Sequence, residues 1–236
     1  MRAPYGMNIL DNCLNCPARE ERLFCALGMP ALQVLNEMKS TAIYPEHALL
    51  FTEGQKARGA FILCSGRAKL SASSNGGRTI IVKISEPGDV LGLSASIANH
   101  PYEVTAEMIE PGQANFISRE ALLQFLRSNS EVAMRVGQVL SLNYYSAHEE
   151  IRTLGITRSP EERLAKLLLS WFTAKENGRG SQIKLTFTHS EIGEMIGATR
   201  ETVTRLFTDL RRRQIVQRMG ATLMLRNKPA LAQMVH

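Results

Sequence analysis

Three cysteines lie close together near the N-terminus, and a fourth follows at a distance. Two residues separate Cys13 from Cys16, Cys25 comes after eight more, and Cys64 stands alone. Thiolates are soft metal ligands and also the reactive form of cysteine in redox chemistry. Without signs of export, structural disulfides are disfavoured. The first three cysteines therefore indicate a metal site or a redox function, whereas Cys64 alone is equally consistent with a small buried hydrophobe.

A second group of residues has the pattern of a helix-turn-helix. Thr188 and Glu191 have the spacing of a capping box, and Thr199 with Thr202 predicts the start of a second helix after a small-residue turn. Apolar residues repeat at three and four positions on the faces that would pack together: Ile192, Met195, Ile196, Val203, Leu206, Phe207 and Leu210.

The polar face of the second helix has the chemistry for reading DNA. Arg200, Glu201 and Arg205 lie in its first two turns, which face base edges in such helices. Arginines on any solvated helix would look similar, but the charge distribution supports DNA as the partner. Residues 159–236 hold thirteen Lys and Arg against seven Asp and Glu, whereas residues 1–158 are neutral. The net charge of +6 thus lies in the part with the helix-turn-helix.

Short β-prone runs alternate with turns from about Met38 to Ser118, which predicts a small antiparallel roll. Asn75-Gly76 is a strong hairpin signal between two of these runs. The predicted strands are Ala48–Phe51, Ala60–Leu63, Ala68–Ser71, Thr79–Ile84 and Gln113–Ile117.

A long helix is predicted from Ser130 to about Gly155. Ser159-Pro160-Glu161-Glu162 then starts another helix through about Ala174, which makes residues 156–159 a candidate hinge. In the long helix, small and apolar residues repeat with spacings of four and three. This strip favours a coiled-coil seam between two chains over packing on the chain's own roll: Ala133, Gly137, Leu140, Tyr144, Ala147, Ile151 and Leu154.

Composition narrows the class of protein. A chain of 236 residues with 44% hydrophobic content can form more than one domain with a buried core. It contains no run of about 18 apolar residues and no signal-peptide core, so a cytoplasmic protein without membrane contact is expected. The five histidines lack the spacing of metal ligands or of a catalytic triad, so no enzymatic activity is expected.

The order of these parts resembles the Crp/Fnr superfamily of bacterial transcription regulators. The motifs that carry the resemblance are Pro87–Gly92, Pro160–Ala165, Glu191–Gly193 and Thr199–Arg205. It implies an α+β fold with an antiparallel β-roll of the cyclic-nucleotide-binding, jelly-roll type, a long dimerisation helix and a C-terminal winged helix-turn-helix. The implied partners are double-stranded DNA, RNA polymerase and a second copy of the chain. The implied domains are a cysteine-containing segment at 1–37, the roll at 38–118, the dimerisation helix region at 119–157 and the DNA-binding domain at 158–236.

The resemblance also implies which residues contact DNA. Arg200, Glu201 and Arg205 match the base-reading residues of the cyclic-AMP receptor branch, whereas the Fnr branch has valine at the position of Arg200. This implies a half-site similar to TGTGA rather than TTGAT. The expected backbone contacts are Thr188, Ser190, Thr202, Arg211 and a β-hairpin wing at Gln214–Asn227.

Cyclic AMP is not the expected effector. Cyclic-nucleotide binders hold the ribose with a Gly-Glu-Leu stretch and the phosphate with an Arg-Ser pair, but here these read Gly92-Leu93-Ser94 and Tyr102-Glu103. A buried anion without its arginine is costly. Hydroxyl residues that bind the base are replaced by Ala147 and His148.

The cysteines instead resemble the cluster ligands of Fnr proteins and imply a 4Fe-4S iron-sulfur cluster that senses oxygen, nitric oxide or redox state. This chain departs from the Fnr pattern, because the spacing from Cys16 to Cys25 is longer and the fourth Fnr cysteine aligns with Asn115. Cys64 becomes the expected fourth ligand if the N-terminal loop folds over its strand. Damage to the cluster would then relax the loop and alter the seam of the long helices.

Four alternatives remain open at this point. They are a thiol switch without metal, a structural zinc site, another small ligand in the roll, and an iron-sulfur electron-transfer protein. The basic second helix argues against the last of these.

Overall fold

The computed structural model describes residues 4–7, 9–74, 76–156, 159–174 and 182–235. The chain divides into two compact units, Met1–Ser146 and Ala147–His236, and the division falls within the long helix α4 (Ser130–Ile156). In the described ranges, no helix is both long and apolar enough to cross a membrane.

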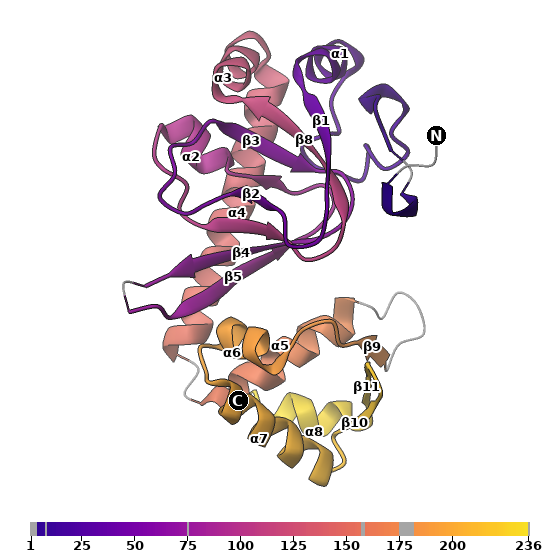
Figure 1. The fold of residues 1–236 in the computed structure, drawn as a ribbon, viewed down its shortest axis with the longest axis vertical. Coiled ribbons are helices and arrows are strands. Elements are labelled where there is room, and N and C mark those ends of the chain that lie inside the picture. Colours follow the sequence, from indigo (N-terminus) through magenta and orange to yellow (C-terminus); the bar gives the residue numbers. More distant parts are fainter. Residues whose placement is uncertain (1–3, 8, 75, 157–158, 175–181, 236) are drawn as a thin grey trace. The chain divides into compact units, whose positions relative to one another are not determined.

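The first unit contains the antiparallel roll that the sequence predicts (Figure 1). Its strands form two four-stranded sheets with the orders β1-β8-β3-β6 and β2-β7-β4-β5. The predicted strands correspond to β2, β3, β4, β5 and β8, and Asn75 of the predicted hairpin turn lies outside the described residues. The strands are β1 (Ser40–Tyr44), β2 (Leu49–Phe51), β3 (Gly59–Leu63), β4 (Ala68–Ser73), β5 (Thr79–Ser85), β6 (Val90–Leu91), β7 (Thr105–Met108) and β8 (Gly112–Ser118).

Helices α1, α3 and α4 pack against the roll. The start of the long helix at Ser130 is confirmed, and a separate helix, α3, precedes it in the predicted dimerisation region. Ser118 caps α3, because its Oγ accepts a hydrogen bond from the Ala121 N–H at 3.2 Å. Besides α4, the helical elements of this unit are η1 (Pro4–Gly6), η2 (Cys13–Asn15), α1 (Met29–Met38), α2 (Leu93–Ala98) and α3 (Arg119–Ser128).

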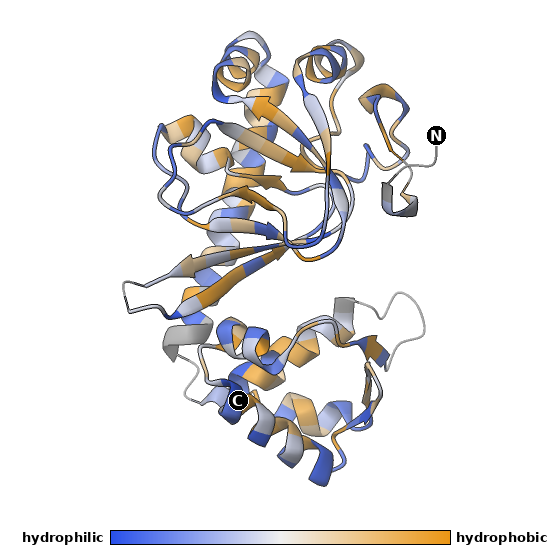
Figure 2. Cartoon of the chain, in the orientation of Figure 1, coloured by the Kyte–Doolittle hydropathy of each residue, from blue (hydrophilic) through white to orange (hydrophobic). Residues whose placement is uncertain are grey.

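Two apolar cores hold this unit together, and hydrophobic residues run along β3, all five of whose residues are buried (Figure 2). One core contains Phe51 and Leu63 from the roll interior. The other buries Ile62 of the roll against Leu35 of α1 and Phe125 of α3. Because α1 and α4 both contribute to this second core, the N-terminal segment and the long helix share one packing unit.

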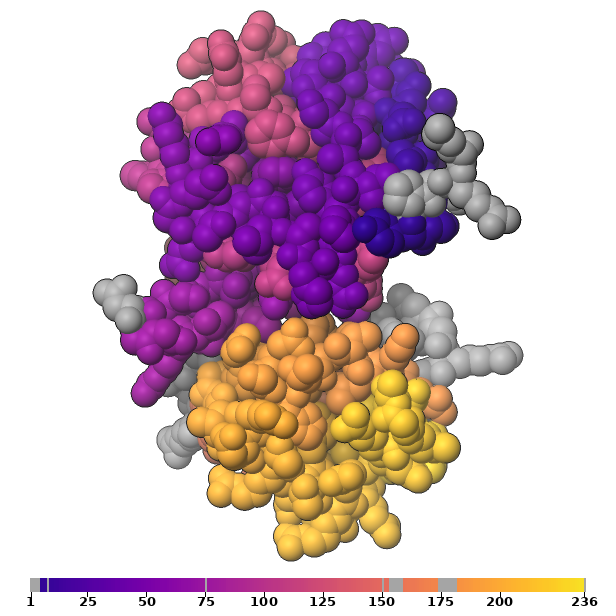
Figure 3. Space-filling model, viewed as in Figure 1, coloured from indigo at the N-terminus to yellow at the C-terminus, as the bar shows by residue number. Residues whose placement is uncertain are grey.

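The N-terminal segment lies directly on the roll (Figure 3). The Gln113 side chain of β8 makes two 2.8 Å hydrogen bonds to the backbone of Leu10, one as donor and one as acceptor. Lys39 Nζ donates to the Asp11 carbonyl at 2.6 Å, and Asn36 Oδ1 accepts from the Cys13 N–H at 2.8 Å. These contacts fix the cysteine loop against the sheet.

The second unit is a winged helix-turn-helix, as predicted. The capping box at the start of α5 is confirmed, with Ser159 and Glu162 bonding each other's backbone N–H groups. Residues 157–158 of the candidate hinge lie outside the described residues. A three-stranded sheet has the order β10-β11-β9. The elements are α5 (Pro160–Ala174), β9 (Gln182–Lys184), α6 (His189–Ile196), α7 (Arg200–Arg212), β10 (Val216–Met219), β11 (Thr222–Leu225) and α8 (Lys228–Gln233).

Candidate cysteine centre and nucleic-acid interface

The start of α6 and the turn between α6 and α7 are both fixed by local contacts. Thr188 Oγ1 accepts from the Glu191 N–H at 3.2 Å, and the Glu191 carboxylate accepts from the Thr188 N–H at 2.9 Å. Gly197 ends α6 with a φ of 61°. A Cβ on Gly193 would lie 2.6 Å from the Ala198 carbonyl oxygen, so the two helices approach too closely for a larger residue there.

The helix α7 has one buried and one exposed face. Val203, Phe207 and Leu210 are buried in one core with Ile192 and Ile196 of α6. The three predicted base-reading residues are all exposed in the first two turns of α7: Arg200, Glu201 and Arg205. This arrangement leaves the polar face of α7 exposed to solvent.

The predicted backbone-contacting residues lie around that face. Thr188, Ser190 and Arg211 are exposed, whereas Thr202 is half-buried and donates its backbone N–H to Thr199 Oγ1 at 3.2 Å. The predicted wing is the β10-β11 hairpin, in which Val216 pairs with Leu225.

The charge state of Glu201 suits hydrogen-bond acceptance. A hydrogen bond from its own backbone N–H, followed by one from Thr199, lowers the pKa of its carboxyl, and the nearby Arg200 acts in the same direction. An ionised carboxylate accepts hydrogen bonds, as base reading at cytosine requires.

His189, the first residue of α6, is a further residue of this interface that no sequence pattern indicates. Its Nδ1 lies 2.8 Å from Thr204 Oγ1 of α7, and its ring stacks on Phe207 with centroids 5.1 Å apart. Burial, and then the charges of Arg218, Arg200 and Arg211, lower the pKa of this imidazole. The histidine therefore belongs to the arginine-rich face of the helix-turn-helix, and its distance in sequence from Thr204 gives no signal of this.

All four cysteines line one small cavity between the N-terminal segment and the roll. Cys13 lies in η2 with Cys16 directly after it, Cys25 precedes α1, and Cys64 follows β3. The N-terminal loop thus folds over the end of β3, next to Cys64. This is the arrangement in which Cys64 is expected to be the fourth ligand. None of the four thiols is in a disulfide, and all four are partly buried.

Asn115 lines the same cavity. Its Nδ2 donates to Cys13 Sγ at 3.8 Å, and its Cα partner on β3 is Ile62, two residues before Cys64. The alignment position of the fourth Fnr cysteine and the position of Cys64 are therefore two places on neighbouring strands that face one cavity.

The cavity strongly affects the protonation of the thiols. Burial raises the pKa of Cys25 to about 12 and that of Cys64 to about 11, and it raises the pKa of Cys13 as well. Neighbouring thiols act in the same direction, whereas Arg22 lowers the pKa of Cys25 and Cys64. Added positive charge inside the cavity would be required to ionise these thiols at neutral pH.

The cavity is small. Its volume is about 20 Å³, which is room for about one water molecule. Among the described residues, no group of three or more His, Cys, Asp or Glu side chains is arranged to hold a metal ion. Any larger group at this place would require the N-terminal segment to move away from the sheet.

The cysteine loop is also tied to α4. Phe24 and Leu27 flank Cys25 and are buried in the same core as Val132 of α4. Glu131 of α4 accepts hydrogen bonds from the Gly28 N–H at 3.0 and 3.1 Å. A shift of Cys25 would therefore change the packing and the hydrogen bonds at the start of α4.

The other face of α4 carries most of the predicted seam. Val132 and Val136 pack on the roll, whereas Ala133, Gly137, Tyr144, Ala147 and Ile151 are exposed. Leu140 is half-buried against the core of the roll, and the side chain of Leu154 lies outside the described residues. No atom lies within 4 Å of a Cβ built on Gly137, so this face has open space in a single chain.

Core side chains occupy the two positions assigned from the sequence to the ribose and phosphate sites of cyclic-nucleotide binders. Leu93 and Tyr102 are 2% and 3% exposed. The Tyr102 ring stacks on Phe51 with centroids 4.0 Å apart, and its hydroxyl donates to the Gly59 carbonyl at 2.7 Å. These contacts leave Tyr102 as part of the apolar core.

Comparison with known proteins agrees with this architecture. Residues 42–129 match the cyclic nucleotide-binding domain, and residues 162–234 match the Crp-like helix-turn-helix domain. The CRP-like cAMP-activated global transcriptional regulator of Mycobacterium tuberculosis is 24% identical over 213 residues, or 89% of this chain and 95% of that protein. The transcriptional activatory protein AadR of Rhodopseudomonas palustris is 26% identical over 204 residues, or 86% of this chain and 84% of that protein.

A solved structure has the same fold. FixK2 from Bradyrhizobium japonicum superposes with a TM-score of 0.72 at 22% identity, over 84% of this chain and 98% of that one. At this identity the likeness concerns the fold alone.

Proposed function

Because the chain belongs to the Crp/Fnr family of DNA-binding transcription regulators, we propose that it is a homodimer that senses oxygen, nitric oxide or redox state through a cysteine-ligated 4Fe-4S cluster and binds a TGTGA-like palindrome. The observation that carries the sensing part is the convergence of Cys13, Cys16, Cys25 and Cys64 on one cavity. The exposed Arg200, Glu201 and Arg205 carry the DNA-reading part.

The donor set fits an iron-sulfur cluster. Four thiols are the ligands that such a cluster requires. Arg22 and Lys39 act on these thiols by charge, so cations are already in place to offset part of the negative charge of four thiolates. When bound, the cluster would supply oxidant-sensitive iron and the positive charge that ionises the thiols.

The protein's own contacts provide a route from the cavity to the long helix. Accommodating a group larger than one water moves the loop, and Phe24 and Leu27 transmit that movement to the core that contains Val132. The hydrogen bonds between Gly28 and Glu131 give the loop a second link to α4. We infer that the state of the cysteine centre sets the packing of α4, and hence the pairing of two chains.

Self-association is supported by the exposed face of α4. Tyr144 and Ile151 are 69% and 66% exposed, which is costly for an isolated chain. The small Ala133, Gly137 and Ala147 on the same face would allow a second helix to approach closely. A two-fold dimer would present two copies of α7 to successive major grooves.

The roll favours a different effector from cyclic AMP, although one relative is named as cAMP-activated. A nucleotide phosphate at the position of Tyr102 would displace an aromatic side chain from the core and find no guanidinium in its place. The cysteine cavity is the stronger candidate for the sensing site.

A thiol switch and a structural zinc ion remain the second candidates for the cysteines. Burial that raises the pKa of Cys25 and Cys64 disfavours a metal-free switch, because reactive thiols need a low pKa. A single zinc ion would need four sulfurs about 2.3 Å from one point. Among the described residues, no three such side chains are arranged around one point, so zinc and a cluster alike would require the loop to move.

The proposal is tested by binding to a TGTGA palindrome before and after exposure to air, with iron measured on the same samples. Protein purified without oxygen should lose affinity about tenfold or more as its iron is lost. Cys25→Ser should bind no cluster and should show no response to air. Loss of affinity in air with full retention of iron would contradict the sensing mechanism, and absence of sequence preference would contradict the DNA assignment.

A further inference from the structure

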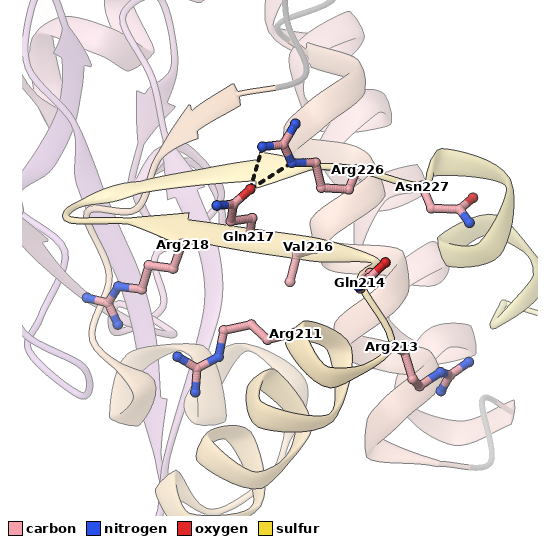
Figure 4. A pocket seen from close by; sticks show the side chains of 8 residues that line it. All are labelled: Arg211, Arg213, Gln214, Val216, Gln217, Arg218, Arg226 and Asn227. Atoms are coloured by element: carbon pink, nitrogen blue, oxygen red, sulfur yellow. Dashed lines mark hydrogen bonds between the residues drawn. The ribbon is translucent and has the colours of Figure 1, made fainter.

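An arginine-rich cleft of about 700 Å³ lies between the end of α7 and the wing (Figure 4). Four arginines line it, namely Arg211, Arg213, Arg218 and Arg226, and its other lining residues are uncharged. A cleft lined by one sign of charge attracts the opposite sign. The cleft therefore favours an anion.

The four arginines are not equivalent. Arg213 bonds Glu161 at 2.9 Å and Asp209 at 3.4 Å, and it points away from Arg211 and Arg218 in Figure 4. Arg226 is held by the Gln217 side chain. Arg211 and Arg218 point to the same side, and in the described part of the chain neither lies within ion-pairing distance of a carboxylate. These two guanidinium groups are available to a bound anion.

His189 of α6 does not line the cleft itself but lies beside the same helix, at Thr204 of α7. Thr204 and Thr208 follow Arg200 at intervals of four, and their hydroxyls donate to the carbonyls of Arg200 and Thr204 at 2.9 Å. Arg211 then donates to Thr208 Oγ1 at 3.4 Å. Since His189 Nδ1 lies 2.8 Å from Thr204 Oγ1, the imidazole is fixed beside this stripe.

The electrostatic surroundings of His189 are positive. Arg218 is the strongest charged influence on the imidazole, followed by Arg200 and Arg211 of α7. On its own helix, the Glu191 carboxylate bonds the backbone and side chain of Thr188. With Nδ1 at Thr204, no described residue bonds Nε2, so this nitrogen can serve a ligand.

We propose that His189, Arg211 and Arg218 form a site for one phosphate of the DNA backbone, and that His189 takes up a proton from solvent when this phosphate binds. Nε2–H of the resulting imidazolium donates to the phosphate. The inference rests on the proposed DNA-binding function but is independent of the cysteine centre. DNA is favoured over a small anion because the site continues the surface that carries Arg200.

The direction of the pH dependence follows from the charges. In the free protein, burial and three arginines lower the pKa of His189. A phosphate would raise it, because an opposite charge favours the imidazolium. DNA affinity should therefore increase as pH falls toward the histidine range, and the proton-linked part should disappear as pH rises through the pKa of the complex. A rise of one pKa unit on binding corresponds to about tenfold in affinity per chain.

The test measures DNA affinity at constant salt from about pH 6 to about pH 8. Because phosphate contacts are independent of sequence, it uses both a TGTGA palindrome and an unrelated duplex. Wild type should tighten about tenfold toward low pH on both duplexes. His189→Gln, which can still bond Thr204, should remove most of this dependence, and His189→Arg should bind with little pH dependence because its charge is permanent.

The control is His100→Gln, which removes an exposed histidine of the roll and should behave as wild type. Proton uptake is measured directly as the difference in binding enthalpy between two buffers of different ionisation enthalpy, and His189→Gln should lose it. An unchanged pH dependence in folded His189→Gln would overturn the inference. If wild type bound the palindrome no better than the unrelated duplex but kept the pH effect, the proposed base reading would be contradicted instead.

Discussion

The Glu131 carboxylate caps the N-terminus of α1, because it accepts hydrogen bonds from the Gly28 N–H at 3.0 and 3.1 Å. The two residues are 103 positions apart. Gly28 follows Cys25 by three residues, and Glu131 is the second residue of α4. This contact joins the cysteine loop directly to the helix that carries the predicted seam.

Glu131→Ala should uncouple the cysteine centre from α4. We expect a loss of about 1 kcal/mol in the free energy of unfolding, as for removal of a helix cap. Iron binding should persist, but the difference in DNA affinity before and after air should shrink. Chemical denaturation, iron analysis and DNA titration check these outcomes. Glu120→Ala on α3 is the control, and an equal effect of both variants would argue against the coupling.

Cys64→Ser should abolish cluster binding if Cys64 is the fourth ligand. Because Asn115 faces the same cavity, the double variant Cys64→Ser/Asn115→Cys should recover much of the iron. Iron and sulfide per chain, measured after oxygen-free purification, decide this. Full iron content in Cys64→Ser would show that Cys64 is only a buried hydrophobe.

Arg205→Ala and Arg211→Ala should weaken DNA binding in different ways. Arg205 is assigned to a base edge, so its loss should cost about 1 to 3 kcal/mol on the cognate site and relax preference at one base pair. Arg211 is assigned to a phosphate, so its loss should weaken all duplexes about equally and reduce the salt dependence. Titrations on single-base variants of the site separate the two effects. A uniform loss for both would refute the base-reading assignment.

Gly137→Leu should weaken the dimer without harming the single chain. A Cβ at Gly137 meets no atom within 4 Å, and leucine has about 1 kcal/mol better helix propensity than glycine. A second helix packed closely at this point would collide with the added side chain. Sedimentation equilibrium should show more monomer than for wild type or for Gln124→Leu on α3. An unchanged monomer fraction would place the dimer contact elsewhere.

The helix-turn-helix can be predicted from the sequence, because the residues that define it lie close together in the chain. Thr188 and Glu191 lie three residues apart, and the apolar faces of α6 and α7 follow the helical repeat. The strands β1 and β7 are harder to predict from the sequence, since their residues are only partly apolar and the strands with which they pair are distant in the chain. Ser40, for example, pairs with Phe116.

The cysteine cavity depends on contacts that no local pattern reveals. The sequence indicates which thiols could act together, but the Gln113 side chain holds Leu10 from 103 positions away. His189 was missed for the same reason, because its surroundings include Thr204 and Arg218 from two other elements.

The most direct test of the sensor is an ultraviolet-visible spectrum with iron and sulfide analysis of protein purified without oxygen, followed by admission of air. A 4Fe-4S cluster should give broad absorption near about 400 nm, about four irons per chain, and bleaching in air. A colourless protein without iron would contradict the cluster and leave a thiol switch, structural zinc or another ligand in the roll.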